Sequence, residues 1–145
     1  MAHIEVTKLM NVNPARLYAT IADPSTWGQW FAMHDTFVGE PPKQIAVNSR
    51  MVQNVHVLGM SHRVELTVTS FRPPMHLVLS GSSAAGVACE FRFSVRRQAG
   101  GSELTLSGDF TGPALTGGLM RAVDTDVVAK LEASLDRLAA LAEAA

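Results

Sequence analysis

Histidines are the first side chains of this sequence to consider for chemistry, because an imidazole can bind a metal or transfer a proton near neutral pH. Their spacing does not favour a metal site. Only His56 and His62 lie close together, and the register predicted for their hairpin places them on opposite faces of the sheet. The sequence has no His-x-x-x-His pair and no cysteine cluster, which are typical spacings of zinc ligands. We therefore predict no metal and no cofactor, although the chain holds five histidines: His3, His34, His56, His62 and His76.

Two polar residues, Gln53 and His62, are predicted to lie on the inner face of the sheet and are the candidates we name for catalysis. An unpaired buried amide costs about 1–3 kcal/mol, so Gln53 needs a partner from the protein, from water or from a ligand. His62, at a strand end, would be a general base or a ligand contact near the rim, or a partly exposed strand-end residue. The single cysteine, Cys89, lies in an apolar row and is expected to pack as a small hydrophobe.

Carboxylates are what a cyclase or a hydrolase would use for acid–base catalysis. The acids on the clearly alternating strands all fall on the polar face, away from the predicted interior. No Ser-His-Asp arrangement, phosphate-binding glycine loop or zinc signature can be recognised either. The sequence therefore leans away from an enzyme and leaves the question open. These acids are Glu5, Glu65, Glu90, Glu103 and Asp109.

The elements that must position these residues begin with a strand over His3–Met10, where apolar and polar residues alternate. A short helix follows, since Asn13 can cap it and Pro14 suits its first position. Asp23-Pro24 ends this helix, because proline cannot continue the hydrogen-bond ladder. Ser25–Trp30 predicts a second short helix that carries both tryptophans.

Alternating apolar residues also mark strands in the middle of the chain, most clearly in VELTV, GVACEFRFSVRR and ELTLSGDF. One apolar face and one polar face per strand are typical of an antiparallel sheet. Gly59-Met60 predicts a two-residue type II′ turn, which would pair Val57 with His62 and His56 with Arg63. That register directs Met51, Gln53, Val55 and Val57 inward and His56 outward.

One long helix is predicted to end the chain, beginning after Gly112-Pro113. Its apolar residues recur at steps of three and four and form an inner stripe. The opposite side carries charged residues, among them Asp124 and Asp126. Strands, two short helices and a long helix predict an α+β fold. The stripe consists of Leu115, Leu119, Val123, Val127, Leu131, Leu135 and Leu138.

Length and composition fit a single domain over residues 1–145, with 47% hydrophobic residues. The net charge of −1, with acids and bases interspersed, gives no indication of nucleic-acid binding. One cysteine fits a reducing compartment, and we find neither a signal peptide nor an apolar run long enough to span a membrane. The expectation is a cytoplasmic protein, either a monomer or a homodimer.

The order of elements, together with NPARLYATIADPSTWGQW, FRPP before MHLVLSG, and GPALTGGLMRAV, resembles the START-like, helix-grip superfamily also called SRPBCC. Within it the chain is similar to polyketide cyclase/dehydrase-like proteins, and FRPP with GPAL resembles an actinobacterial branch with toxin-like members. The resemblance implies about seven antiparallel strands curved around a long C-terminal helix, with two short helices after the first strand. The superfamily includes carriers, receptors, cyclases and toxins, so the fold does not choose among them.

The resemblance also implies a cavity between the sheet and the last helix. An apolar lining without convergent acids favours a non-catalytic carrier or sensor of a lipid, polyketide or isoprenoid. The alternatives are a cyclase or dehydratase, and a toxin paired with an antitoxin protein. The predicted lining is Trp30, Met33, Met51, Gln53, Val55, Leu66, Val68, Cys89, Phe91, Phe93, Leu119 and Val123.

The stretch DPSTWGQW places its two tryptophans three residues apart, on one helical face. We interpret Trp27 as a structural residue that locks the short helices onto the body. Trp30 is the one expected to contact a ligand at the mouth of the cavity.

Overall fold

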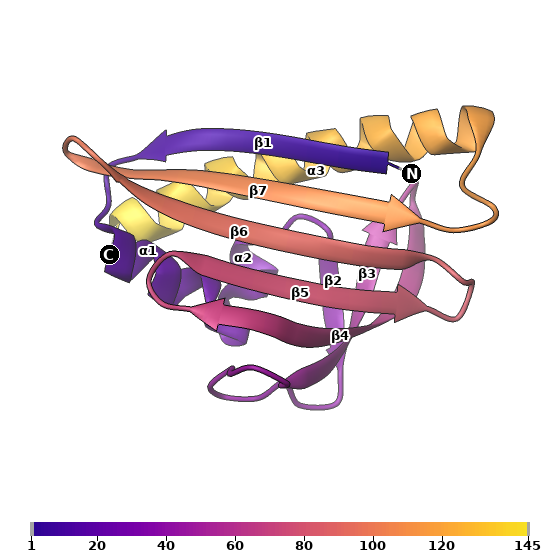
Figure 1. Ribbon diagram of the computed structural model, residues 1–145, viewed down its shortest axis with the longest axis horizontal. Coiled ribbons are helices and arrows are strands. Elements are labelled where there is room, and N and C mark those ends of the chain that lie inside the picture. The colour runs from indigo at the N-terminus through magenta and orange to yellow at the C-terminus, as the bar shows by residue number, and fades with distance from the viewer. Residues whose placement is uncertain (1, 145) are drawn as a thin grey trace.

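A computed structural model describes residues 2–144 and shows a seven-stranded antiparallel sheet that curves around one long helix (Figure 1). The strand order is β1-β7-β6-β5-β4-β3-β2, so that β1 and β2 form the two edges. The predicted fold class is confirmed. The strands are β1 (Ala2–Met10), β2 (His34–Val38), β3 (Arg50–Val57), β4 (Met60–Arg72), β5 (His76–Ser83), β6 (Ala88–Gln98) and β7 (Gly101–Thr111).

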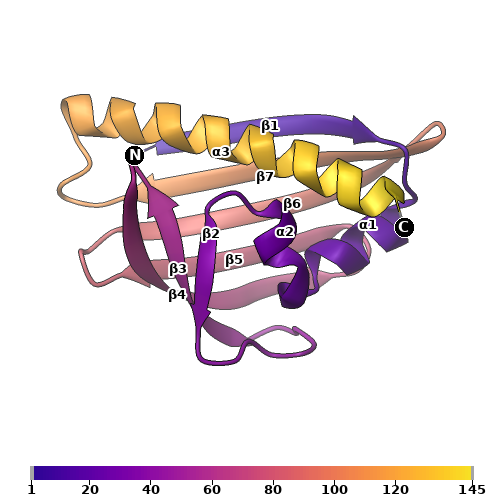
Figure 2. The same cartoon turned by 180° about the vertical axis from the view of Figure 1, so that it is seen from behind.

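The helices all lie on the concave side of the sheet (Figure 2). They are α1 (Pro14–Ile21), the 3₁₀ turn η1 (Pro24–Thr26), α2 (Trp27–Trp30) and α3 (Gly117–Ala144). The long helix α3 runs beside β1 and β7, and the short helices lie near its C-terminal half. None of the helices in residues 2–144 is both long and apolar enough to cross a membrane.

The start and end of α1 follow the predicted local chemistry. Asn13 Oδ1 accepts a hydrogen bond from the backbone N–H of Arg16 at 2.8 Å, which satisfies one of the free donors at the helix start. After α1 ends, Asp23 Oδ1 accepts from the backbone N–H of Ser25 at 3.1 Å and begins η1. The chain therefore turns back over the sheet at the predicted Asp-Pro break.

The hairpin between β3 and β4 differs from the prediction in its turn. Val57 pairs with Met60 and Val55 with His62, so the turn residues are Leu58 and Gly59 rather than Gly59 and Met60. Both have positive φ, +55° and +73°, as a type I′ turn requires. The predicted register is wrong by two residues, and a shift of two leaves every side chain on its own face. The inward set that includes Gln53 is therefore unchanged.

The inner faces of β6 and β7 follow the predicted alternation. Cys89, Phe91, Phe93 and Val95 are buried, while the residues between them are exposed or half-buried. Leu104, Leu106 and Phe110 on β7 are buried in the same way. Both strands therefore present one apolar face to the interior of the protein.

Helix α3 begins at Gly117, later than predicted, and its inner stripe is shifted at the start. Leu119, predicted to face inward, is 46% exposed. At 3.6 residues per turn it lies about 80° around the helix from the fully buried Val127, which explains the difference. Asp124, predicted on the outer side, shares a face with Val127 and Leu131 and is half-buried. The stripe therefore begins at Val123 within the helix.

Candidate functional site

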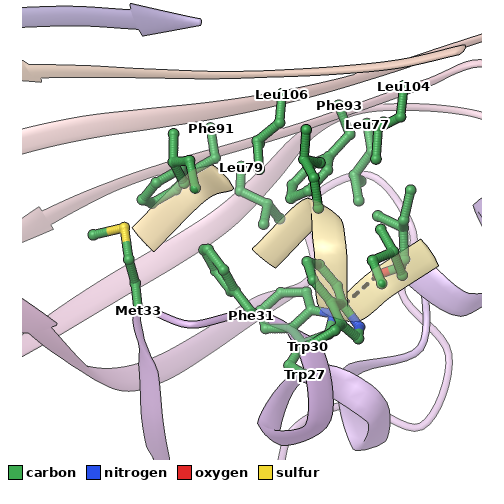
Figure 3. Close-up of a cluster of buried hydrophobic side chains, with 14 of the residues drawn as sticks. Trp27, Trp30, Phe31, Met33, Leu77, Leu79, Phe91, Phe93, Leu104 and Leu106 are labelled. Carbon is green, nitrogen blue, oxygen red and sulfur yellow. Dashed lines mark hydrogen bonds between the residues drawn. The ribbon is translucent and has the colours of Figure 1, made fainter. Parts of the chain in front are cut away.

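The space between the sheet and the helices is occupied by a cluster of buried aromatic and aliphatic side chains (Figure 3). Trp30 stacks on Phe31, with ring centroids 5.4 Å apart, and meets Phe93 edge to face at 6.0 Å. Phe31 meets Phe91 edge to face at 5.5 Å. Leu77 and Leu79 of β5 extend into the same cluster from the sheet. The interior is therefore apolar and closely packed.

Eleven of the twelve predicted lining residues are buried, each with at most 9% of its surface exposed, and only Leu119 is not. Burial places them in the core of the protein, and their contact with a ligand stays a prediction. The eleven are Trp30, Met33, Met51, Gln53, Val55, Leu66, Val68, Cys89, Phe91, Phe93 and Val123.

Two hollows in the described residues are lined by strands and their neighbouring loops and by no residue of α3. One, of about 400 Å³, is at the end of β1 and the tip of the β6–β7 hairpin, beside Met10 and Gln98. The other, of about 490 Å³, is lined by residues of β3, β4 and β5, which include the exposed Glu65 and the buried Met51 and Leu66. A cavity between the sheet and α3 therefore stays a prediction, and a ligand would have to open the packed interior.

Both tryptophans are fully buried, and each indole N–H is satisfied. Trp27 Nε1 donates to the backbone carbonyl of Ile21 at 2.9 Å and thereby ties α2 to the end of α1. Trp30 Nε1 donates to Thr26 Oγ1 at 2.9 Å. Trp27 matches its interpretation as a structural residue. Trp30 lies inside the aromatic cluster rather than at a surface opening, so the interpretation of a mouth residue needs correction.

Gln53, on the inner face of β3, has a protein partner that the sequence did not reveal. Its Nε2 lies 2.7 Å from Nδ1 of His34 on β2. Because an amide nitrogen can only donate, Nδ1 accepts and the imidazole carries its proton on Nε2. Partial burial lowers the pKa of His34, against the raising effect of Asp35, which favours this neutral ring.

The oxygen of the same amide is unpaired. Gln53 is fully buried, and its Oε1 has no hydrogen-bond partner in the structure. The other such atom among residues 2–144 is Oδ1 of Asp124 on α3. The two unpaired acceptors therefore belong to a fully buried residue of the sheet and to a half-buried residue of the helix.

The remaining candidates offer less chemistry. His62 is half-buried opposite Val55, near the end of the β3–β4 hairpin. Burial raises the pKa of Cys89 to about 11, against a backbone hydrogen bond from Gly81, so its thiol stays protonated at neutral pH. No group of three or more possible metal ligands occurs in residues 2–144. None of the five strand acids is buried, and Glu90 and Glu103 pair with arginines on the outer face.

Asp126, at the side of α3, is a residue whose role the sequence did not indicate. Its Oδ2 accepts from the backbone N–H of Leu58 at 2.9 Å and from Lys130 Nζ at 2.7 Å. Burial alone would raise its pKa, but these hydrogen bonds and the lysine charge outweigh burial and lower it. Asp126 thus fastens the β3–β4 turn to the helix.

Comparison with known proteins gives both a family match and a fold match. The sequence model described as "Polyketide cyclase / dehydrase and lipid transport" matches residues 1–143. An uncharacterized protein of Mycobacterium tuberculosis is 30% identical over 141 residues, which is 97% of this chain and 99% of the relative. A protein of the same organism named a toxin is 24% identical over 122 residues, or 84% and 85% of the two chains.

Solved structures share the fold at low identity. The Zhui aromatase/cyclase from Streptomyces sp. R1128 matches with a TM-score of 0.79 and 14% identity, over 98% of this chain and 93% of that one. A Mycobacterium smegmatis protein matches with a TM-score of 0.73 and 15% identity, over 98% and 91%. At these identities the likeness concerns the fold alone.

Proposed function

Since the chain belongs to the polyketide cyclase/dehydrase and lipid transport family, we propose that it binds a hydrophobic small molecule between the sheet and α3. The ligand classes are a lipid, a polyketide or an isoprenoid, held by a non-catalytic carrier or sensor. The observation that carries this proposal is the apolar inner wall, which includes Phe91, Phe93 and Val127 and which no buried lysine, arginine, aspartate or glutamate interrupts in residues 2–144. Such a lining with few polar groups is what small-molecule sites usually present.

Access for the ligand is expected at the beginning of α3. Within residues 2–144, the side-chain hydrogen bonds and ion pairs from α3 to other elements come from Asp126, Ser134, Asp136 and Glu143. The helix before Asp126 is held by packing alone, and it starts at Gly117 with a φ of +55°. Displacing this first part of the helix breaks no such bond and uncovers Val123 and its neighbours.

The direct test is to identify what the purified protein carries. Native mass spectrometry should show a bound species, and organic extraction should release an apolar compound. A displaceable apolar dye such as Nile red should bind with one site per chain. A protein that carries no such compound and binds neither the dye nor any lipid would contradict the proposal.

A matched pair of variants locates the site. Phe93→Leu alters the buried inner wall, while Leu9→Ala alters a side chain that is 67% exposed on β1. We expect Phe93→Leu to change dye affinity by about tenfold, or about 1.4 kcal/mol, and Leu9→Ala to leave it unchanged. Equal effects of both variants would place the dye on the surface.

The likeness to an aromatase/cyclase fold supports a cyclase or dehydratase as a second candidate. His62 and Gln53 would be its polar participants. Turnover of a poly-ketone substrate that disappears in His62→Ala and Gln53→Ala would favour the enzyme, and turnover unaffected by both would remove these roles.

The similarity to a relative named a toxin supports a third candidate, a protein that acts on growth through a partner. Growth arrest upon expression, relieved by the product of an adjacent small gene, would favour it. Normal growth upon expression would leave the carrier as the better proposal.

A further inference from the structure

The unpaired oxygen of Gln53 indicates what the ligand must offer. A buried acceptor without a partner is costly, and native structures rarely keep one. Gln53 is 0% exposed, so water does not reach it, and no protein group donates to its Oε1. Something that donates a hydrogen bond would complete the site.

In the structure the amide nitrogen of Gln53 faces the neighbouring imidazole. Nε2 donates to Nδ1 of His34 at 2.7 Å. A half-turn of the amide keeps a bond only if His34 carries its proton on Nδ1, and the orphan group would then be the Nε2 donor. With the amide oriented as it is in the structure, the orphan group is an acceptor, and it selects a donor.

The charges around the interior argue against an acidic ligand. No lysine or arginine is buried in residues 2–144, so no cation lies inside to pair with a carboxylate. The second orphan atom, Oδ1 of Asp124 on α3, offers no donor to such a ligand either. An ionised fatty acid would be desolvated in this interior without a cation to compensate its charge, whereas a neutral hydroxyl has no charge to compensate.

We propose that the protein selects a hydrophobic alcohol or phenol, whose hydroxyl donates to Oε1 of Gln53, over the corresponding fatty acid or ester. The inference rests on the proposed function, because it names the head group of the molecule bound between the sheet and α3. Gln53 is a binding residue in this scheme, and His34 positions it.

The experiment compares three compounds with the same chain: 1-tetradecanol, myristic acid and methyl myristate. Each displaces Nile red from the protein at pH 8, where the acid is ionised. The ester is neutral and lacks a donor, so it separates the effect of charge from that of the hydroxyl. We expect the alcohol to bind about tenfold more tightly than the ester, and the acid to bind least.

A variant assigns the preference to one residue. Gln53→Met keeps the length of the side chain and removes the acceptor, so the alcohol should lose its advantage over the ester. Asn54→Ala is the matched control, because Asn54 is the next residue of β3 and its amide bonds Thr36 on the other face. It should leave the preference unchanged.

The outcomes separate the two proposals. If none of the compounds displaces the dye and none binds directly, the proposed function and this inference both fail. If the ester or the acid binds as tightly as the alcohol, the inference alone fails. It also fails if folded Gln53→Met keeps the preference, and should that variant not fold, the ranking of the three compounds on the unaltered protein decides.

Discussion

Two adjoining parts of the interior differ in how completely their polar atoms are paired. Around the short helices, the indole N–H groups of Trp27 and Trp30 donate to Ile21 and Thr26. On β3 and on α3, Gln53 and Asp124 each keep a buried oxygen without a partner. The two parts meet at His34, whose ring lies 6.4 Å from that of Trp27 and bonds the Gln53 amide.

This difference separates stability from function. Paired polar atoms among packed rings need nothing further and hold the fold together. A buried acceptor without a partner lowers stability. Native proteins keep such groups mainly at functional sites, where another molecule supplies the missing donor. The first part is therefore expected to respond to substitution as a structural core, and the second as a binding site.

Truncation of Trp27 should have the largest effect. Trp27→Ala removes ring contacts to Phe31 and Phe37 and leaves the carbonyl of Ile21 unpaired. We expect the free energy of unfolding to fall by about 3–5 kcal/mol, measured by urea denaturation. Trp27→Phe should cost less, since it keeps most of the ring packing. A loss below about 1 kcal/mol for the alanine variant would contradict the structural role given to the cluster around the short helices.

Replacement of Gln53 should raise the free energy of unfolding or leave it unchanged. Gln53→Met removes the orphan oxygen and also the bond to the half-buried His34, so the free energy of unfolding should stay the same or rise by about 1 kcal/mol. Ser134→Ala is the matched control, because Ser134 is equally buried and its Oγ donates to Lys130 and accepts from Ala32.

The control should lose about 1–2 kcal/mol, because it leaves the N–H of Ala32 without its partner. If Gln53→Met lost as much stability as Ser134→Ala, the amide of Gln53 would serve the fold, as the paired atoms do, rather than mark a binding site.

The alternation along each strand predicted the inner wall well, because side-chain direction depends only on the parity of the register. That is why Gln53 was placed inward although the turn at Leu58-Gly59 was not the one predicted. Its partner His34 could not be predicted, since the β2–β3 pairing joins residues distant in sequence and is irregular between His34 and Thr36. Asp124 lies nearer the buried side of α3 than predicted, because the predicted stripe starts at Leu115, which precedes the helix.

Asp126 tests the part of α3 that also carries Asp124. Asp126→Asn keeps an acceptor for the N–H of Leu58 but removes the charge that pairs with Lys130. We expect the free energy of unfolding to fall by about 0.5–1 kcal/mol at pH 7, as is usual for such pairs near the surface.

The pH dependence of stability tests whether the charge of Asp126 causes this loss. Its pKa is lowered in the folded protein, so its contribution is present above the unfolded value of 3.8 and lost as the pH falls through the folded pKa. The variant should therefore approach the unaltered protein in stability under strongly acidic conditions. A difference that stayed constant with pH would exclude the charge as its cause.

The smallest expected effect is the titration of His34, and it tests the boundary between the two parts. Partial burial lowers its pKa below 6.5 in the folded protein. The unfolded chain then binds more protons near pH 6, so the contribution of His34 to stability is complete above pH 6.5 and declines as the pH falls through the folded pKa.

Protonation of His34 also places a hydrogen on Nδ1, which opposes Nε2 of Gln53 and lets the amide turn its oxygen toward His34. Acidification should therefore shift the His34 ring signals in NMR below pH 6.5 and reduce the preference for an alcohol over an ester, both changes following one titration. His34→Gln should abolish the first change and uncouple the second from pH. An alcohol preference that stays constant while His34 titrates would mean that the Gln53 oxygen does not hold the head group.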